Sequence, residues 1–351
     1  MKILKYFFFL LLIVIIGFSI YVATLDGSYQ VEETAVIDAP AQMLFDEVND
    51  YKNWEEWGPW AAKHPNMILE YPEKTSGEGA GYSWETDKMN GSIKTTAVLP
   101  GKSIEQEMVF DTPFGPSKSK VYWKFEALEN LPNDKTGGTK VTWGMKGEQN
   151  FWEKAYQLTQ DKTPAEMVRP MLKTGLKNLA ETVKKAMEVY EISVNGVTQH
   201  SGGFYMYMTT ASKNSGKALG AKMAKMLPQV FLYMQQNNIA MTGAPMTVYN
   251  NIDEQNGTVI ISSGIPTSSR VITPAESEVL CGFLPSQKVV KITLKGNYDH
   301  LSEAWAAGKK FISESRYELN KNANPFEVYV TDPKEVPNPA EWITEVYFPI
   351  K

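Results

Sequence analysis

A short internal repeat constrains the fold of the C-terminal half more than any other feature of the sequence. The segment APMTVY at residues 244–249 aligns with NPFEVY at 324–329, with proline, valine and tyrosine at matching positions. A second match relates SSGIP at 262–266 to EVYFP at 345–349. A single copy of such a unit cannot bury its apolar face alone. The repeat therefore predicts two similar halves that pair their sheets and leave a groove between them.

Each copy is expected to run strand, helix, strand, strand. The helices are expected near 216–237 and 299–315, where apolar residues recur at helical spacing. The expected strands are GGFYMYMTTAS, APMTVYN and GTVIISSGIP in the first copy, and KVVKITLKG, NPFEVYV and WITEVYFPI in the second.

The N-terminal half has a different order of elements. From Ser28 an alternating strand runs to Pro40, and a short helix, AQMLFDEVNDY, follows. A tryptophan-rich loop leads into a meander of six candidate strands, which are punctuated by glycine and turn signals. A long amphipathic helix from about Pro164 to Tyr190 closes the region.

This half resembles the helix-grip fold of the START/polyketide-cyclase-like superfamily, known as SRPBCC. The resemblance rests on VIDAPAQMLFDEVNDYKNWEEWGPW at the front and MVRPMLKTGLKNLAETVKKAME at the back. It implies a curved sheet that grips the long helix around an apolar cavity. It implies no activity, because the superfamily includes enzymes, lipid carriers and binders.

The C-terminal half resembles the GyrI-like (AraC-type) effector-binding domain. The motifs are KITLKGNYDHLSEAW, NPFEVYVTDP and WITEVYFPI. In that family a glutamate after the second helix lies at the base of an aromatic pocket and pairs with cationic, apolar ligands, and the matching position here is Glu327. The expected fold class is α+β: a transmembrane helix, a helix-grip antiparallel sheet domain and a duplicated GyrI-like domain, at residues 1–26, 27–190 and 191–351.

Glu327 is therefore the main candidate ligand-binding residue. Strand alternation places it on the same face as Tyr329 and opposite to Phe326 and Val328. The first copy has Thr247 at the equivalent position, an asymmetry that fits one ligand between the halves but that drift also produces. The candidate aromatic walls for a cation are Tyr298, Trp305, Tyr329 and Tyr205. The alternative is that Glu327 faces solvent and the rings are core.

The N-terminus is expected to cross a membrane. Residues 6–25 carry no charge, which matches the roughly 20 apolar residues of a spanning helix and exceeds the apolar region of a cleaved signal peptide. Lys2 and Lys5 precede the span, and acidic residues follow it. The positive-inside rule then predicts a single-pass protein with a cytoplasmic N-terminus and its body on the periplasmic or extracellular side.

The net charge and the residue composition limit the classes of partner that the protein is expected to bind. The net charge of -5 argues against nucleic-acid binding, which needs a basic face. One cysteine and three scattered histidines form no zinc motif and no nucleophile–histidine set, so no metal, cofactor or catalytic residue is expected.

The favoured function is binding of a small hydrophobic molecule or lipophilic cation at the membrane, for sensing, sequestration or handover. A hydrolase that uses Glu327 and a tyrosine as an acid/base pair is one alternative. A structural or partner-binding envelope protein is the other, and protein partners are unspecified. The loop NWEEWGPW (53–60) either lines a cavity mouth or the membrane interface, or packs over the core with its own rings.

Overall fold

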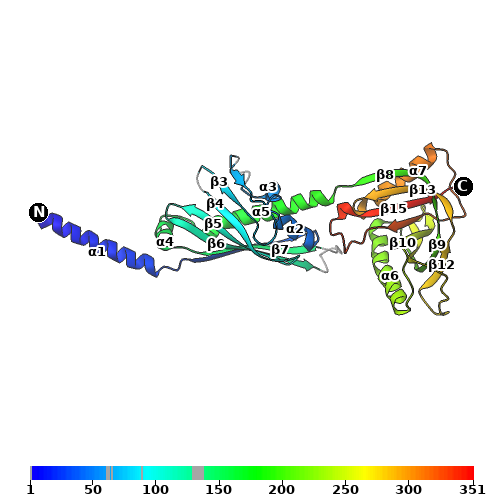
Figure 1. Ribbon diagram of the computed structural model, residues 1–351, viewed down its shortest axis with the longest axis horizontal. Helices are drawn as coiled ribbons and strands as arrows, with labels where there is room; N and C mark the ends of the chain where they lie inside the picture. The colour runs from blue at the N-terminus through cyan, green and yellow to red at the C-terminus, as the bar shows by residue number, and fades with distance from the viewer. Residues whose placement is uncertain (1, 61–63, 65, 88–89, 129–137) are drawn as a thin grey trace. The chain divides into compact units, whose positions relative to one another are not determined.

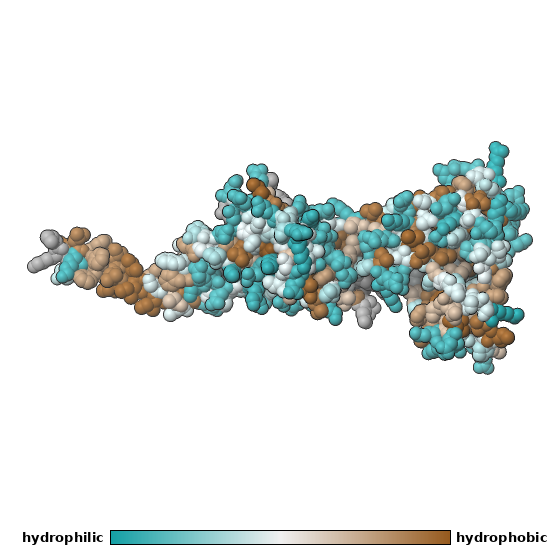
Figure 2. Space-filling model, in the orientation of Figure 1, coloured by the Kyte–Doolittle hydropathy of each residue, from teal (hydrophilic) through white to brown (hydrophobic). Residues whose placement is uncertain are grey.

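The chain forms two compact units, residues 1–185 and 186–351, which are described separately. The computed structural model describes residues 2–60, 64, 66–87, 90–128 and 138–351 (Figure 1). Helix α1 (Lys2–Thr24) precedes the first sheet and exposes nearly all of its apolar side chains, which colour it mostly brown in Figure 2. One stretch of it, Ile3–Thr24, is long and apolar enough to cross a membrane.

The first unit contains a seven-stranded antiparallel sheet in the order β1-β7-β6-β5-β4-β3-β2. The expected meander of six strands is present, and the first strand closes onto the last one. The strands are β1 (Ser28–Ile37), β2 (Ile68–Glu70), β3 (Gly81–Glu85), β4 (Gly91–Leu99), β5 (Ser103–Thr112), β6 (Gly115–Leu128) and β7 (Gly138–Glu148). The helices are α2 (Ala41–Asn49), α3 (Trp54–Trp57), α4 (Phe151–Gln157) and α5 (Pro164–Met187).

Helix α5 buries one apolar stripe, as its spacing predicts. Leu172, Leu176, Leu179 and Val183 are buried on it. Gly175 lies in the same stripe against an indole ring: a Cβ there would come within 2.4 Å of Cζ3 of Trp143. The contact between this helix and the sheet therefore depends on a residue without a side chain, which lets the ring approach the helix backbone.

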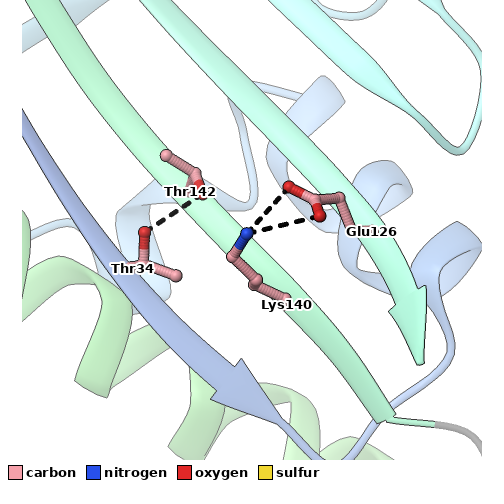
Figure 3. A network of polar contacts seen from close by, with 4 residues as sticks. All are labelled: Thr34, Glu126, Lys140 and Thr142. Atoms are coloured by element: carbon pink, nitrogen blue, oxygen red, sulfur yellow. Dashed lines mark hydrogen bonds and ion pairs between the residues drawn. The ribbon is translucent and has the colours of Figure 1, made fainter.

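Figure 3 shows polar pairs between neighbouring strands of this sheet. Lys140 and Thr142 alternate with Val141 and Trp143 along β7, so the polar pairs lie on the face opposite to Trp143. Thr34 on β1 pairs with Thr142 on β7, with 3.1 Å between their hydroxyl oxygens. Lys140, two residues before Thr142 on the same face, donates to both carboxylate oxygens of Glu126 on β6 at 3.1 and 3.3 Å. Each such pair contributes about 0.2–1 kcal/mol and fixes the strand register.

The second unit is one eight-stranded antiparallel sheet, in the order β12-β9-β11-β10-β14-β15-β13-β8. The expected copies are β9 (Gly203–Lys213), α6 (Gly216–Gln236), β10 (Met246–Asp253) and β11 (Thr258–Thr267), then β13 (Gln287–Lys295), α7 (Leu301–Glu314), β14 (Phe326–Tyr329) and β15 (Ile343–Pro349). A 3-10 turn, η1 (Tyr298–His300), precedes α7, and η2 (Pro339–Glu341) precedes β15. The two copies meet at the β10–β14 pair in the middle of the sheet.

Two further strands lie at the edges of this sheet and were not expected from the sequence. β8 (Glu191–His200) precedes the first copy but pairs with β13 of the second. β12 (Leu280–Leu284) precedes the second copy but pairs with β9 of the first. The strand that precedes each copy in the sequence therefore pairs with a strand of the other copy. Neither strand has the alternation of buried and exposed residues that would have revealed it.

Candidate functional site

The candidate site lies where the two copies of the repeat meet. Thr247 on β10 is the direct cross-strand partner of Glu327 on β14. These are the two positions that the repeat alignment makes equivalent, so an approximate twofold axis passes between them. Around this axis the backbone N–H of Tyr249 donates to Pro325, and that of Tyr329 donates to Pro245, at 3.0 and 2.9 Å.

Glu327 is buried, with 1% of its surface exposed, and its carboxylate accepts three hydrogen bonds. Tyr249 Oη and Trp305 Nε1 donate to Oε1 at 2.8 and 2.6 Å. Tyr329 Oη donates to Oε2 at 2.7 Å. The alternative of a solvent-facing Glu327 does not hold, and three donors offset part of the cost of burying the group.

Burial raises the pKa of the Glu327 carboxyl above its ordinary value, and the bonds from Trp305, Tyr329 and Tyr249 oppose that rise. The pKa values of the Tyr249 and Tyr329 hydroxyls are raised well above 10, first by burial and then by the adjacent Glu327 charge. Both tyrosines therefore keep their protons at neutral pH and act as donors. Glu327 is the carboxylic acid of the site, and its charge is costly unless a cation accompanies it.

Aromatic rings surround this carboxylate. Trp305, on α7, packs edge-on against Tyr249 and Phe348, with centroids 4.7 and 5.1 Å away. Tyr298 in η1 lies one ring further out, 5.8 Å from Tyr329 and 4.8 Å from Trp342 between centroids. Burial raises the pKa of Tyr298 to about 12. The structure thus brings together Tyr298, Trp305 and Tyr329 around Glu327.

Tyr205 lies elsewhere. It packs against a cluster that includes Phe326 and Val328, the residues of β14 that point away from Glu327. Its neighbour Met206 points to the other face and packs under α6. Because both faces of β9 carry large side chains, its sequence does not indicate which face the helix covers.

Two residues of the site were not anticipated. Tyr249 is the repeat equivalent of Tyr329 and contacts the same carboxylate, so the alignment itself contained a signal for it. Met223, on α6, places its sulfur 3.2 Å from Thr247 Oγ1 and 2.9 Å from Tyr329 Oη. No sequence pattern distinguishes this methionine from the others on α6, because its role depends on how the helix lies on the sheet.

In the first unit, tryptophan rings fill the space under α5. Trp54, Trp57, Trp123 and Trp143 are each no more than 1% exposed. Trp123 and Trp143 stack at 4.3 Å, and Trp54 and Trp57 lie 5.0 Å apart. The loop 53–60 therefore packs into the core, and the alternative that its tryptophans line the membrane interface does not hold for Trp54 and Trp57.

Two depressions in the surface lie away from both the Glu327 site and the tryptophan cluster. One, of about 870 Å³, is a shallow depression beside α6, lined by Ala218, Ala221 and the ends of β9 and β11. The other, of about 170 Å³, lies at the β2–β3–β4 edge next to Trp84 and Asp111. Within the residues that the structure describes, no group of three His, Cys, Asp or Glu side chains is placed to hold a metal ion.

Comparison with known families assigns the two halves separately. Residues 28–184 match the family described as polyketide cyclase/dehydrase and lipid transport. Residues 204–351 match the GyrI-like small molecule binding domain. Both are families of ligand-binding domains, in the order expected from the sequence. No curated protein sequence matches the chain significantly.

Several solved structures resemble parts of the chain. The C-terminal domain of EcmrR is 16% identical, with a TM-score of 0.39, covering 46% of this chain and 98% of its own. SAV2435 bound to tetraphenylphosphonium is 15% identical, with a TM-score of 0.33 over 46% of this chain and 94% of its own. Protein CV1439 from Chromobacterium violaceum is 16% identical, with a TM-score of 0.33 over 44% and 95%.

Proposed function

We propose that this chain, which joins a polyketide-cyclase-like half to a GyrI-like half, is a membrane-anchored binding protein for a small apolar or lipophilic cationic molecule. The observation that carries the proposal is the buried Glu327, which is surrounded by three hydrogen-bond donors and an aromatic shell. The match of residues 204–351 to a small-molecule-binding family supports it. Sensing, sequestration and handover are the roles that such binding would serve.

The chemistry of the site favours a cation over an anion or a neutral polar ligand. A carboxylate in apolar surroundings recovers part of its lost hydration energy from a nearby positive charge. The rings of Trp305, Tyr298 and Tyr329 add cation–π attraction of about 0.5–2 kcal/mol each when they face the charge. Entry of the ligand requires the rings to move apart, because Glu327 has only 1% of its surface exposed.

Anchoring by α1 is part of the same proposal. A stretch of 22 residues, Ile3–Thr24, is apolar enough on average to cross a membrane, and Lys2 and Lys5 stand at the N-terminal end of the helix. This supports a single-pass arrangement with a cytoplasmic N-terminus and both folded units on the periplasmic or extracellular side. Ligands that partition into the bilayer would then be concentrated next to the protein.

The test is ligand-induced thermal stabilisation of the detergent-solubilised chain, with tetraphenylphosphonium and a neutral hydrophobic analogue as probes. Saturation at 100 times the dissociation constant stabilises a protein by about 2.7 kcal/mol. We expect the cation to stabilise the wild type and to lose that effect in Glu327→Gln. The matched control is Glu345→Gln, which removes a half-buried carboxylate that pairs with Lys291 at 2.6 Å on the neighbouring strand. Equal stabilisation in all three proteins would refute the role of Glu327.

A hydrolase remains the second candidate, because Tyr329 Oη lies 2.7 Å from a carboxylate oxygen of Glu327. In that case Glu327 would act as general base with a tyrosine as its acid partner. Binding is the better supported reading, since three donors already occupy the carboxylate and leave little room for a water nucleophile. Ester turnover that is lost in both Glu327→Gln and Tyr329→Phe would favour the hydrolase.

A further inference from the structure

One surface of the first unit has the composition of a membrane-contact site. Four large apolar side chains are exposed there: Phe114 (41%), Trp152 (60%), Tyr156 (55%) and Leu158 (46%). Trp152 and Tyr156 are four residues apart on α4 and therefore share one face of that helix. Tyr156 contacts Phe114, in the turn between β5 and β6, with 6.0 Å between ring centroids. These four residues are named the aromatic patch.

The aromatic patch lies directly at the end of the apolar helix. Lys154, on the side of α4 turned away from Trp152 and Tyr156, donates to the carbonyl oxygens of Leu25 and Ala23 at 2.9 and 3.3 Å. It thus satisfies carbonyl groups that the last turn of α1 leaves open. The backbone of Gln149, just before α4, donates to Gly27 at 2.9 Å. Val22, in that last turn, is fully buried.

The strand register places Phe114 on the same side. Ser28, the first residue of β1, pairs with Glu148, and Ser119 on β6 pairs with the adjacent Gly147. The β5–β6 turn therefore continues beyond the level at which β1 begins, in the direction of α1. At about 3.3 Å per residue, Phe114 extends roughly 15 Å past Ser119.

We propose that the aromatic patch lies in the headgroup region of the bilayer that α1 crosses and holds the first unit directly against the membrane. The inference rests on the anchoring part of the proposed function. Its occupant is the phospholipid interface, because α4, which carries Trp152 and Tyr156, is joined to the end of the spanning helix by the hydrogen bonds of Lys154. Tryptophan and tyrosine concentrate at this depth, where the ring meets acyl chains and its polar edge meets headgroups.

The test uses the full chain in phosphatidylcholine/phosphatidylglycerol vesicles, in a Cys281→Ser background, with an environment-sensitive fluorophore on single cysteines. The patch positions are Phe114→Cys, Trp152→Cys and Tyr156→Cys. The matched control is Val36→Cys, which is 59% exposed near the far end of β1. The anchor control is Ile13→Cys, inside α1. Spin-labelled lipids report depth: a headgroup label detects the interface, and a label deep in the acyl chain detects the span.

We expect the headgroup label to quench fluorescence at all three patch positions and not at Val36. The fluorophore at Phe114 is expected to lose this quenching when Trp152→Ser and Tyr156→Ser are combined. Quenching at Ile13 with patch positions no more quenched than Val36 would overturn the membrane-contact surface while leaving the anchor intact. A blue-shifted but unquenched patch would indicate a protein partner and overturn it equally. Absence of quenching at Ile13 would overturn the anchor and the patch together.

Discussion

The interiors of the two units are built differently: the first consists of packed indole rings, and the second encloses a hydrogen-bonded carboxylate. Under α5, the first unit packs four tryptophans, each no more than 1% exposed, into a cluster held mainly by ring contacts. The second unit places a carboxylate, also 1% exposed, at the centre of its sheet and surrounds it with two tyrosines and one tryptophan as donors. The indole cluster adds dispersion and burial, whereas the carboxylate is costly to bury unless it is neutralised.

This difference indicates which interior is arranged for a ligand. Well-packed aromatic rings stabilise a fold without any further partner. A buried carboxylate whose pKa is raised by burial gains from a nearby cation, which lowers the cost of its charge. This contrast supports the second unit as the place of the binding chemistry that we propose.

The largest expected effect tests the tryptophan cluster. Trp143→Ala removes a ring that stacks on Trp123 and contacts Gly175, and it leaves a cavity that the neighbours cannot fill. We expect a loss of about 3–5 kcal/mol in the free energy of unfolding of the first unit. Denaturant unfolding followed by tryptophan fluorescence measures it. Hydrogen exchange in β14 serves as the control and stays unchanged; a loss below about 1 kcal/mol would show a loosely packed cluster.

The next effect tests the donors around Glu327. Tyr249→Phe removes one hydrogen bond to the buried carboxylate and keeps the ring. Hydrogen bonds to charged groups contribute about 1.5–3 kcal/mol, so we expect a loss of that size in the second unit and a further rise in the pKa of Glu327. Carboxyl-specific NMR titration and denaturant unfolding measure the two effects. Tyr205→Phe, on the other face of the sheet, is the matched control and leaves the pKa of Glu327 unaltered.

A third prediction concerns pH. Because burial raises the pKa of Glu327 above 4.5, the folded state binds more protons than the unfolded chain between the two pKa values. The free energy of unfolding of the second unit therefore falls as pH rises through that window, by about 1.4 kcal/mol per unit of pKa difference. Parallel denaturation curves for wild type and Glu327→Gln isolate this slope, and identical slopes would contradict it.

The same pKa shift predicts how the affinity for a cation depends on pH. A cation binds the ionised carboxylate, so its affinity is expected to increase with pH through the window, and proton release is expected to accompany binding. Calorimetry in two buffers of different ionisation enthalpy detects the released proton. In the first unit the pKa of Glu47 is raised to about 7, mainly by burial and then by Glu56 and Asp50.

The smallest expected effect tests the asymmetry of the repeat. Thr247→Val keeps the shape of the residue opposite Glu327 but removes its bond of 2.9 Å to Ser263. We expect a loss of about 1 kcal/mol, and an unchanged pKa for Glu327 because no Thr247–Glu327 side-chain bond exists among the described contacts. Thermal unfolding and the NMR titration described for Tyr249→Phe measure these quantities. A shifted pKa would show that the two equivalent positions are electrostatically coupled.

Local patterns predicted much of this arrangement. Alternation in NPFEVY placed Glu327 and Tyr329 on one face, and the structure confirms it through their shared hydrogen bond. The repeat predicted that two halves pair, and Thr247 and Glu327 are direct partners across that junction. The order of the elements other than α4, β8 and β12 was also predicted, because strand alternation, helical spacing and turn residues are local properties.

The rest depended on contacts between distant segments. Met223 reaches Tyr329 only because α6 packs across β9 and β11, beside the β10–β14 pair, and no local signal specifies that position. Tyr205 was misplaced because β9 is apolar on both faces. The burial of Trp54 and Trp57 follows from how the loop folds under α5, which a stretch of tryptophans and glutamates does not reveal. Domain boundaries at 26/27 and 190/191 stay predictions.

The exchanged edge strands also determine when the second unit can form during synthesis. Asn195 on β8 and Thr293 on β13 are joined by a side-chain hydrogen bond across 98 residues of chain. Pairing between segments so far apart in sequence requires closure of a long loop. The entropy cost of that closure comes before any stabilising contact forms, which slows folding. The first copy therefore cannot complete its own sheet as it emerges, and the carboxylate at the junction becomes enclosed only after the last strand has been made.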